Sequence, residues 1–274
     1  MRVKLRRSAL SLLLCAALAL SGAGSTARCT PKAFGVFLGV PAQEARWLCG
    51  YDTLVVDAQD LAAADLAALH AHGSRTVYSY LNIGSVETWR ACWPAFCADT
   101  LGPYENWPDE CWMDVSQPAW QAYLTDAAAK LAAKGADGFF LDNADVYSHC
   151  RTPAVYDGLL RILRQLHALG RPLILNGGGD FVREALRRGD LTGLLQGAAQ
   201  ESVFTTIRFP GGVCTAQDAD VTADLQRYLA VCRQAGLAVY LIEYAPDARL
   251  CAQIGAYCRA NGFAWYAARS AALD

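Results

Sequence analysis

The sequence predicts a single (β/α)8 TIM barrel, an α/β fold, from three observations. Short apolar, β-branched or aromatic runs alternate with amphipathic segments rich in Ala, Leu and Arg, which is the pattern of βα units around a parallel sheet. About 250 residues remain after an N-terminal export signal, a usual size for one barrel. Acid or amide side chains end nearly every apolar run, as expected where barrel strands meet a catalytic face.

The first 27 residues have the parts of a secretory signal peptide. Basic residues precede an apolar run over residues 9–20, and small residues follow, with Ala23 or Ala27 as the place of cleavage. The apolar run is too short for a membrane span, which takes about 20 residues. We therefore expect residues 28–274 to form one barrel domain that is secreted or periplasmic and has no membrane span.

The first half of the remaining chain predicts four strands and two long helices. Each strand is an apolar, β-branched or aromatic run between turn residues, and each helix repeats apolar residues three or four positions apart. The strands are residues 34–38, 54–57, 76–82 and 111–115, and the helices are residues 61–72 and 119–134. Residues 93–108, rich in Trp, Pro, Tyr and Cys, predict a long loop pinned by a disulfide.

The second half continues the alternation. Strands are expected over residues 138–142, 173–176, 195–201 and 239–243, and helices over residues 154–169 and 222–235. The run at residues 263–267 is a ninth possible strand. A closed barrel has eight, so either this run or the one at residues 34–38 lies outside it.

Charge and cysteine content narrow the class of protein further. Without the signal the chain has 20 basic and 26 acidic residues, so it lacks the basic surface of a nucleic-acid-binding protein. Ten cysteines remain besides Cys15, and this even number favours five disulfides of open connectivity in an oxidising compartment. No Cys-x-x-Cys pair occurs and the four histidines are scattered, so no zinc site is expected. We expect a monomer.

Asp142 and Glu201 are the candidate catalytic pair. The stretch Gly135-Ala-Asp-Gly-Phe-Phe-Leu-Asp-Asn-Ala-Asp-Val-Tyr147 ends an apolar strand in Asp142, and Glu201 ends another. Both are expected low in the barrel mouth, where desolvation raises a carboxyl pKa. Glycoside hydrolysis needs two such groups, one to protonate the leaving oxygen and one to attack or to activate water.

Other polar and aromatic residues near the strand ends are candidate substrate contacts. Acids in these positions also cap helices or brace loops, so each one alone is a weaker signal. No Gly-x-Ser-x-Gly or His-Glu-x-x-His motif is present, and we expect no metal and no cofactor. The candidate contacts are Asp57, Tyr80, Glu87, Asp114, Asn143, Asp145, Tyr147, Asn176, Glu243 and Tyr244.

Four blocks of the sequence resemble glycoside hydrolase family 114. They are Tyr80-Leu-Asn-Ile-Gly-Ser-Val-Glu-Thr-Trp-Arg90, Cys111-Trp-Met-Asp-Val-Ser-Gln-Pro118, residues 135–147 and Gln200-Glu-Ser-Val-Phe204. The resemblance implies a barrel that acts as an endo-α-1,4-polygalactosaminidase, with the catalytic pair on Asp142 and Glu201. It also implies support from Asp57, Glu87, Asp114, Asn143, Asp145 and Glu243. Many characterised members have Glu-Pro before the Asp-Asn step, where this chain has Phe-Leu.

The expected function is therefore a secreted, endo-acting glycosidase whose substrate is a polysaccharide containing α-1,4-linked galactosamine. The many acids expected at one barrel face favour a cationic amino-sugar polymer. One alternative is a barrel glycosidase of another polysaccharide. Another is a secreted carbohydrate-binding protein without turnover. Retention or inversion stays open, because it depends on the separation of the two carboxyl groups.

Overall fold

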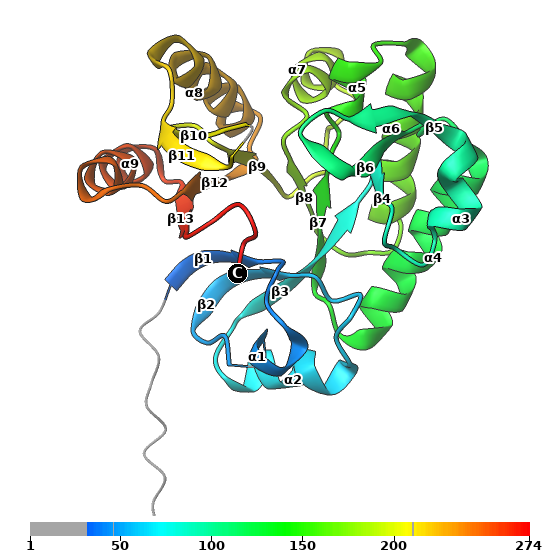
Figure 1. The fold of residues 1–274 in the computed structure, drawn as a ribbon, viewed down its shortest axis with the longest axis horizontal. Helices are drawn as coiled ribbons and strands as arrows, with labels where there is room; N and C mark the ends of the chain where they lie inside the picture. Colours follow the sequence, from blue (N-terminus) through cyan, green and yellow to red (C-terminus); the bar gives the residue numbers. More distant parts are fainter. Residues whose placement is uncertain (1–31, 46, 210) are drawn as a thin grey trace, which may run out of the picture.

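The computed structural model describes residues 32–45, 47–209 and 211–274. In this part of the chain, eight parallel strands form one sheet, and β1 lies beside β13, so that the sheet curls into a nearly closed barrel (Figure 1). This confirms the predicted TIM barrel. In sheet order the strands are β1 (Lys32–Phe37), β2 (Tyr51–Val56), β3 (Thr76–Asn82), β7 (Gly138–Asp142), β8 (Leu173–Asn176), β9 (Gly197–Glu201), β12 (Ala238–Tyr244) and β13 (Ala264–Ala268).

The longer helices pack on the outside of this sheet (Figure 1). Local chemistry sets several of their ends. Thr152 and Asp247 accept hydrogen bonds from the first turns of α6 and α9, and α4 ends at Gly135, whose positive φ of 110° suits glycine. The helices are α1 (Ala42–Ala45), α2 (Ala63–Ala71), α3 (Trp93–Phe96), α4 (Pro118–Lys134), α5 (Val146–His149), α6 (Pro153–His167), α7 (Gly179–Arg188), α8 (Ala219–Gln234) and α9 (Ala248–Asn261). No helix in the described part of the chain is long and apolar enough to cross a membrane.

Side chains alternate between two apolar layers along the barrel strands. On β7, Phe140 belongs to the cluster inside the barrel, whereas Phe139 and Leu141 pack in the layer between strands and helices. Since residues two apart on a strand share a face, Asp142 follows Phe140 towards the barrel mouth. The same alternation turns Asn176, Glu201 and Tyr244 towards the barrel mouth. Each lies two residues after an inward-facing side chain, namely Ile174, Ala199 and Ile242.

The expected strand at residues 111–115 is wrong as a barrel strand. Cys111 belongs to β6 (Trp107–Met113), which pairs antiparallel with β4 (Ser85–Glu87) and β5 (Thr100–Tyr104) in a separate three-stranded sheet. Both runs that competed for the eighth place, residues 34–38 and 263–267, contribute barrel strands instead. The segment 93–108 is not a plain loop, because it contains α3, the 3-10 helix Cys97–Asp99 and β5. A second insert, the hairpin β10 (Thr205–Arg208) and β11 (Val213–Ala216), follows β9.

The expectation of five disulfides is also wrong. Cys49 is disulfide-bonded, but eight other cysteines carry free thiols, so segment 93–108 is not pinned by Cys97. Cys251 and Cys258 lie two helical turns apart on α9, about 10 Å along the axis, beyond the limit of about 7 Å between the Cα atoms of a disulfide. The free thiols are Cys92, Cys97, Cys111, Cys150, Cys214, Cys232, Cys251 and Cys258. The expected signal peptide and Cys29 lie outside the described residues.

Candidate active site

A cleft of about 420 Å³ opens at the carboxyl ends of the barrel strands. Its floor collects one polar side chain from each of several neighbouring strands, as the alternation along the strands requires. Seven of the twelve residues predicted for the site line it. They are Tyr80, Asp142, Asn143, Asp145, Asn176, Glu201 and Tyr244.

Asp142 and Glu201 face each other across Asn176. The side-chain amide of Asn176 donates to Asp142 Oδ1 at 2.9 Å and to Glu201 Oε1 at 2.8 Å. These two oxygens are therefore at most about 5.7 Å apart, the sum of the two hydrogen-bond lengths. The Tyr244 hydroxyl donates to the other oxygen, Glu201 Oε2. One amide thus fixes both carboxylates at a separation that can hold a single sugar carbon between them.

Burial and like charge dominate the electrostatics of this pair. Burial, followed by the nearby charge of Glu201, raises the pKa of Asp142 well above its usual range. Burial also raises the pKa of Asp145 to about 6, although Asp145 Oδ2 accepts a hydrogen bond from the Gly178 amide at 2.9 Å. Burial and the neighbouring carboxylates raise the pKa of Tyr244, which keeps its hydroxyl a donor. Burial and like charge therefore favour the protonated form of Asp142.

Asn143 turns the chain sharply after the strand that carries Asp142. Its φ of 66° is in the left-handed region, and its carbonyl oxygen presses against Gly84, where an added Cβ would lie 1.7 Å from that oxygen. Only glycine fits at Gly84. The Asn143 side chain is buried and donates to Asn82 Oδ1 at 3.2 Å and Ser85 Oγ at 2.9 Å. The Asp-Asn step therefore ties β7 to the loop after β3.

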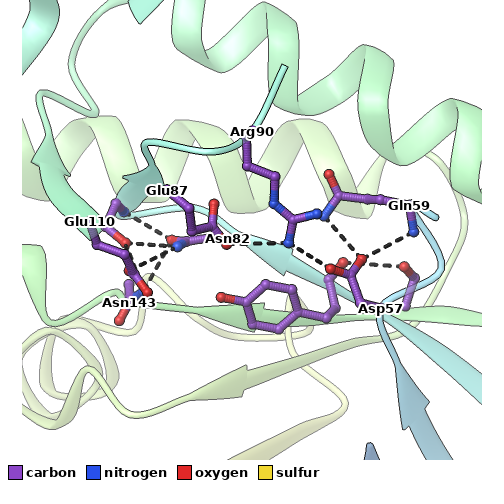
Figure 2. Close-up of polar contacts among 10 residues, drawn as sticks. Asp57, Gln59, Asn82, Glu87, Arg90, Glu110 and Asn143 are labelled. Carbon is purple, nitrogen blue, oxygen red and sulfur yellow. Dashed lines mark hydrogen bonds and ion pairs between the residues drawn. The ribbon is translucent and has the colours of Figure 1, made fainter. Parts of the chain in front are cut away.

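Two predicted acids, Asp57 and Glu87, do not line the cleft. They flank Arg90, which donates to Asp57 at 2.6 Å and to Glu87 at 3.3 Å, while Gln59 also binds Asp57 (Figure 2). The Arg90 side chain is only 10% exposed. The two carboxylates hold this buried guanidinium in place, so one of their two negative charges is compensated.

Three other predicted residues have structural partners. Glu243 shares a strand face with the outer layer and accepts hydrogen bonds from the Phe204 and Thr205 amides, so it braces the segment after β9. Asp114 accepts hydrogen bonds from Ser116 and Gln117 at the turn into α4. Tyr147 packs against the rings of Tyr156 and Phe181.

Several cleft residues escaped the sequence prediction. The insert β5–β6 contributes Tyr104, Trp107 and Glu110, because it folds back over the barrel mouth instead of forming a barrel strand. The segment after β13 crosses towards β1, where the Gly39 amide donates to the Leu273 carbonyl at 3.2 Å (Figure 1). The position of Glu110 between two tryptophans, in Trp107-Pro-Asp-Glu-Cys-Trp112, was the sequence feature that could have predicted it as a site residue. The remaining unpredicted lining residues are Leu38, Gly177, Gln200, Ser202, Ala271, Ala272 and Leu273.

Among the described residues, no group of three or more His, Cys, Asp or Glu side chains is placed to hold a metal ion. The cleft lining includes carboxyl, amide and phenol groups.

A TIM barrel with two close carboxylates at its mouth is the arrangement that glycoside hydrolases use. The family model described as glycoside-hydrolase family GH114 matches residues 21–274, and the chain belongs to this family. It is a glycoside hydrolase by this membership and by its likeness to solved hydrolases. Among curated protein sequences, none matches significantly.

Solved structures share this fold. The glycoside hydrolase domain of PelA from Pseudomonas aeruginosa is 25% identical over 89% of this chain and 96% of that chain, with a TM-score of 0.72. Ega3 from Aspergillus fumigatus, in complex with galactosamine, is 18% identical over 89% of this chain and 92% of that one, with a TM-score of 0.67. The α-galactosidase TtGalA from Thermus thermophilus is 10% identical over 86% and 57%, with a TM-score of 0.56. The last two likenesses concern the fold alone.

Proposed function

We propose that the protein is an endo-acting hydrolase that cleaves α-1,4-linked, galactosamine-containing polysaccharide with retention at the anomeric carbon. The proposal depends on one observation: the side-chain amide of Asn176 donates a hydrogen bond to both Asp142 and Glu201. Retaining enzymes place their carboxyl groups about 5–5.5 Å apart, whereas inverting enzymes need about 6.5–9.5 Å to admit a water. An upper limit of about 5.7 Å between the two bonded oxygens favours retention.

We assign Asp142 as the nucleophile and Glu201 as the acid and base. Asp142 attacks the anomeric carbon while the glycosidic bond breaks, and Glu201 gives its proton to the leaving oxygen. Water then attacks the glycosyl ester, loses a proton to Glu201 and releases Asp142 as a carboxylate. Burial disfavours charge on Asp142, so ester formation there removes a buried charge. Asn176 and Tyr244 orient Glu201 throughout.

The substrate half of the proposal rests on charge and on the comparisons. Four acids line the cleft, Asp142, Asp145, Glu201 and Glu110, while no Lys or Arg is among the described lining residues. Such a cleft attracts a cationic polymer. Ega3 was solved with galactosamine, and the family resemblance implies an endo-α-1,4-polygalactosaminidase. The surplus of acid in the cleft is smaller than the sequence suggested, because Asp57 and Glu87 do not line it and pair with Arg90 instead.

Reducing-end release from a panel of polysaccharides tests this function. The wild-type enzyme should shorten de-N-acetylated and partly acetylated α-1,4-galactosaminan, and should act poorly on pectin, an anionic polymer. Binding of the polymer without any shortening would instead identify a carbohydrate-binding protein. Release only from a neutral or anionic polymer would support hydrolase activity but refute the proposed cationic substrate.

Azide rescue tests the two roles separately. In an Asp142→Ala variant, azide should replace the nucleophile directly and give a β-glycosyl azide from an α-linked substrate. In a Glu201→Ala variant, azide should attack the glycosyl ester and give the α-glycosyl azide. The opposite products would exchange the two roles.

Export also belongs to this proposal. The N-terminal 27 residues resemble a signal peptide, and a polysaccharide substrate lies outside the cytoplasm. Mass spectrometry of the protein from a culture medium or periplasm should find a chain that begins after Ala23 or Ala27. An uncleaved chain retained in the cytoplasm would contradict export.

A further inference from the structure

Glu110 brings a carboxylate into the cleft from outside the barrel. It lies on β6, in the three-stranded insert after β3, and lines the same cleft as Asp142 and Glu201. Its charge also contributes to the raised pKa of Asp142. Glu110 is therefore close enough to the reacting centre to meet a sugar bound there.

A relay of buried polar side chains holds one oxygen of Glu110. Glu110 Oε2 accepts a hydrogen bond from Ser85 Oγ at 2.6 Å and a longer one from Asn82 Nδ2 at 3.5 Å. Asn143 donates in turn to both Ser85 and Asn82, so the three side chains form one connected group behind Glu110 (Figure 2). Buried polar groups stabilise a fold only when they are satisfied, and satisfied networks are rigid.

This relay serves Glu110 and not the catalytic pair. Within the described residues, Asn82, Ser85 and Asn143 make no hydrogen bond to Asp142 or Glu201, which are held by Asn176 and Tyr244 instead. The Asn-Ile-Gly-Ser block and the Asp-Asn step, both prominent in the sequence, thus meet at a carboxylate that hydrolysis does not require. Their placement calls for a different role of Glu110.

The second oxygen of Glu110 is available to a ligand. Glu110 Oε1 accepts no hydrogen bond from any described residue, and it is not among the buried atoms that lack a partner, so it is open to solvent in the cleft. The nearby cation, Arg90, already bonds Asp57 and Glu87. Burial raises the pKa of Glu110, as expected for a carboxylate without a cation of its own.

An aromatic surface lines the same cleft as this oxygen. Trp107, three residues earlier on β6, also lines the cleft, and the residue is 38% exposed. An aromatic face can pack against the apolar face of a sugar ring while a carboxylate binds a charged substituent of the same ring. The insert therefore combines the two contacts that an amino sugar offers.

We propose that Glu110 determines specificity by binding the protonated amine of a galactosamine unit, with Ser85, Asn82 and Asn143 as its positioning residues. The inference rests on the proposed function, because it concerns an amino-sugar polymer. The proposed function attributes attraction of the polymer to the acidic cleft as a whole. The present inference assigns recognition of the amine to one carboxylate that takes no part in bond cleavage.

The test compares Glu110→Gln with Asp109→Asn. Asp109 is the exposed neighbour on β6, and its side chain makes no hydrogen bond within the described chain, so both variants lose one negative charge but only Glu110→Gln changes the cleft. kcat/KM is measured at low and at physiological salt on de-N-acetylated and on fully N-acetylated α-1,4-galactosaminan. Thermal unfolding checks that both variants are folded.

Glu110→Gln should lower kcat/KM on the free-amine polymer about tenfold to a hundredfold and leave the value for the acetylated polymer nearly unchanged. Its salt dependence should weaken, because one screened attraction is lost. Asp109→Asn should behave as wild type, and Ser85→Ala should show a smaller loss of the same preference.

Two results would overturn the inference while leaving the proposed function intact. Equal loss on both polymers would make Glu110 a structural or general catalytic support, and an unchanged preference for the free amine would assign recognition elsewhere. Wild-type enzyme that cuts neither polymer would refute the proposed function first, and the inference with it.

Discussion

Tyr244 donates a hydrogen bond to Glu201 from the neighbouring barrel strand. Both residues follow inward-facing apolar side chains, Ile242 on β12 and Ala199 on β9, so the alternation along two adjacent strands aims them at one point. The phenol is buried and, with its pKa raised, stays protonated as a donor. It stabilises negative charge on Glu201 without competing for the proton.

Replacement of Tyr244 by Phe should therefore slow turnover. The change removes one hydrogen bond to a charged group, worth about 1.5–3 kcal/mol, and keeps the ring in the core. kcat should fall about tenfold to a hundredfold, with a smaller change in KM. The matched control is Tyr228→Phe, which removes a buried hydroxyl of a residue outside the cleft lining. Equal effects of the two changes would contradict this role of Tyr244.

Removal of either candidate catalytic carboxyl should nearly abolish activity. Asp142→Asn and Glu201→Gln each preserve shape but remove nucleophilic attack or proton transfer, so kcat should fall by several orders of magnitude. The measurement is reducing-end release, with circular dichroism to verify the fold. Asp137→Asn is a control outside the cleft, since Asp137 bonds the Val77 amide. Activity near the wild-type level in either cleft variant would refute the pair.

Glu243 should make stability depend on pH. Burial raises the pKa of Glu243 from 4.5 to about 7, so the folded protein binds this proton more tightly than the unfolded chain. The free energy of unfolding should then fall as pH rises from about 4.5 to about 7, by roughly 2–3 kcal/mol from this group. Urea unfolding at several pH values measures it.

Glu243→Gln is the matching variant for that titration. It cannot ionise, so the decrease in stability between these pH values should shrink. It should also be less stable at low pH, because an amide accepts fewer of the hydrogen bonds from Phe204 and Thr205. A variant with the same pH dependence as wild type would assign the effect to other buried acids such as Asp145.

Trp107 should contribute to polymer binding more than to bond cleavage. Its exposed ring lines the cleft and contacts Phe209 of the second insert, with ring centroids 5.9 Å apart. Trp107→Ala should raise KM about tenfold and change kcat little, since stacking acts equally before and during the reaction. Trp47→Ala is the control, because Trp47 is exposed and stacks on His72 ahead of β3. A loss confined to kcat would contradict a binding role.

Much of the barrel and its reactive centre could be predicted because both depend on local patterns. The limits of β3, β7 and β8 follow directly from apolar runs that end in Asn82, Asp142 and Asn176. Glu243 could also have been judged from its strand, since it alternates with Tyr244 and so faces the helices. Once Tyr244 is known to face inward, the alternation along the strand is enough to predict that Glu243 lies outside the cleft.

The insert and the thiols depend on long-range contacts that no local pattern reports. The apolar run at residues 111–115 predicted a barrel strand, yet residues 111–113 belong to β6, which pairs with β4 and β5. Glu110 enters the cleft only through that pairing. In the same way an even cysteine count says nothing of distance, and Cys251 and Cys258 lie too far apart on α9 to bond.

The configuration of the first-formed product tests the central claim most directly. If Asp142 and Glu201 act as a retaining pair across Asn176, proton NMR during early hydrolysis of α-1,4-galactosaminan should show the α-anomer first, followed by slow mutarotation to the β-anomer. The upper limit of about 5.7 Å between the two oxygens bonded by Asn176 favours this double displacement over inversion. Initial appearance of the β-anomer would mean inversion, and would contradict the double displacement on which the account depends.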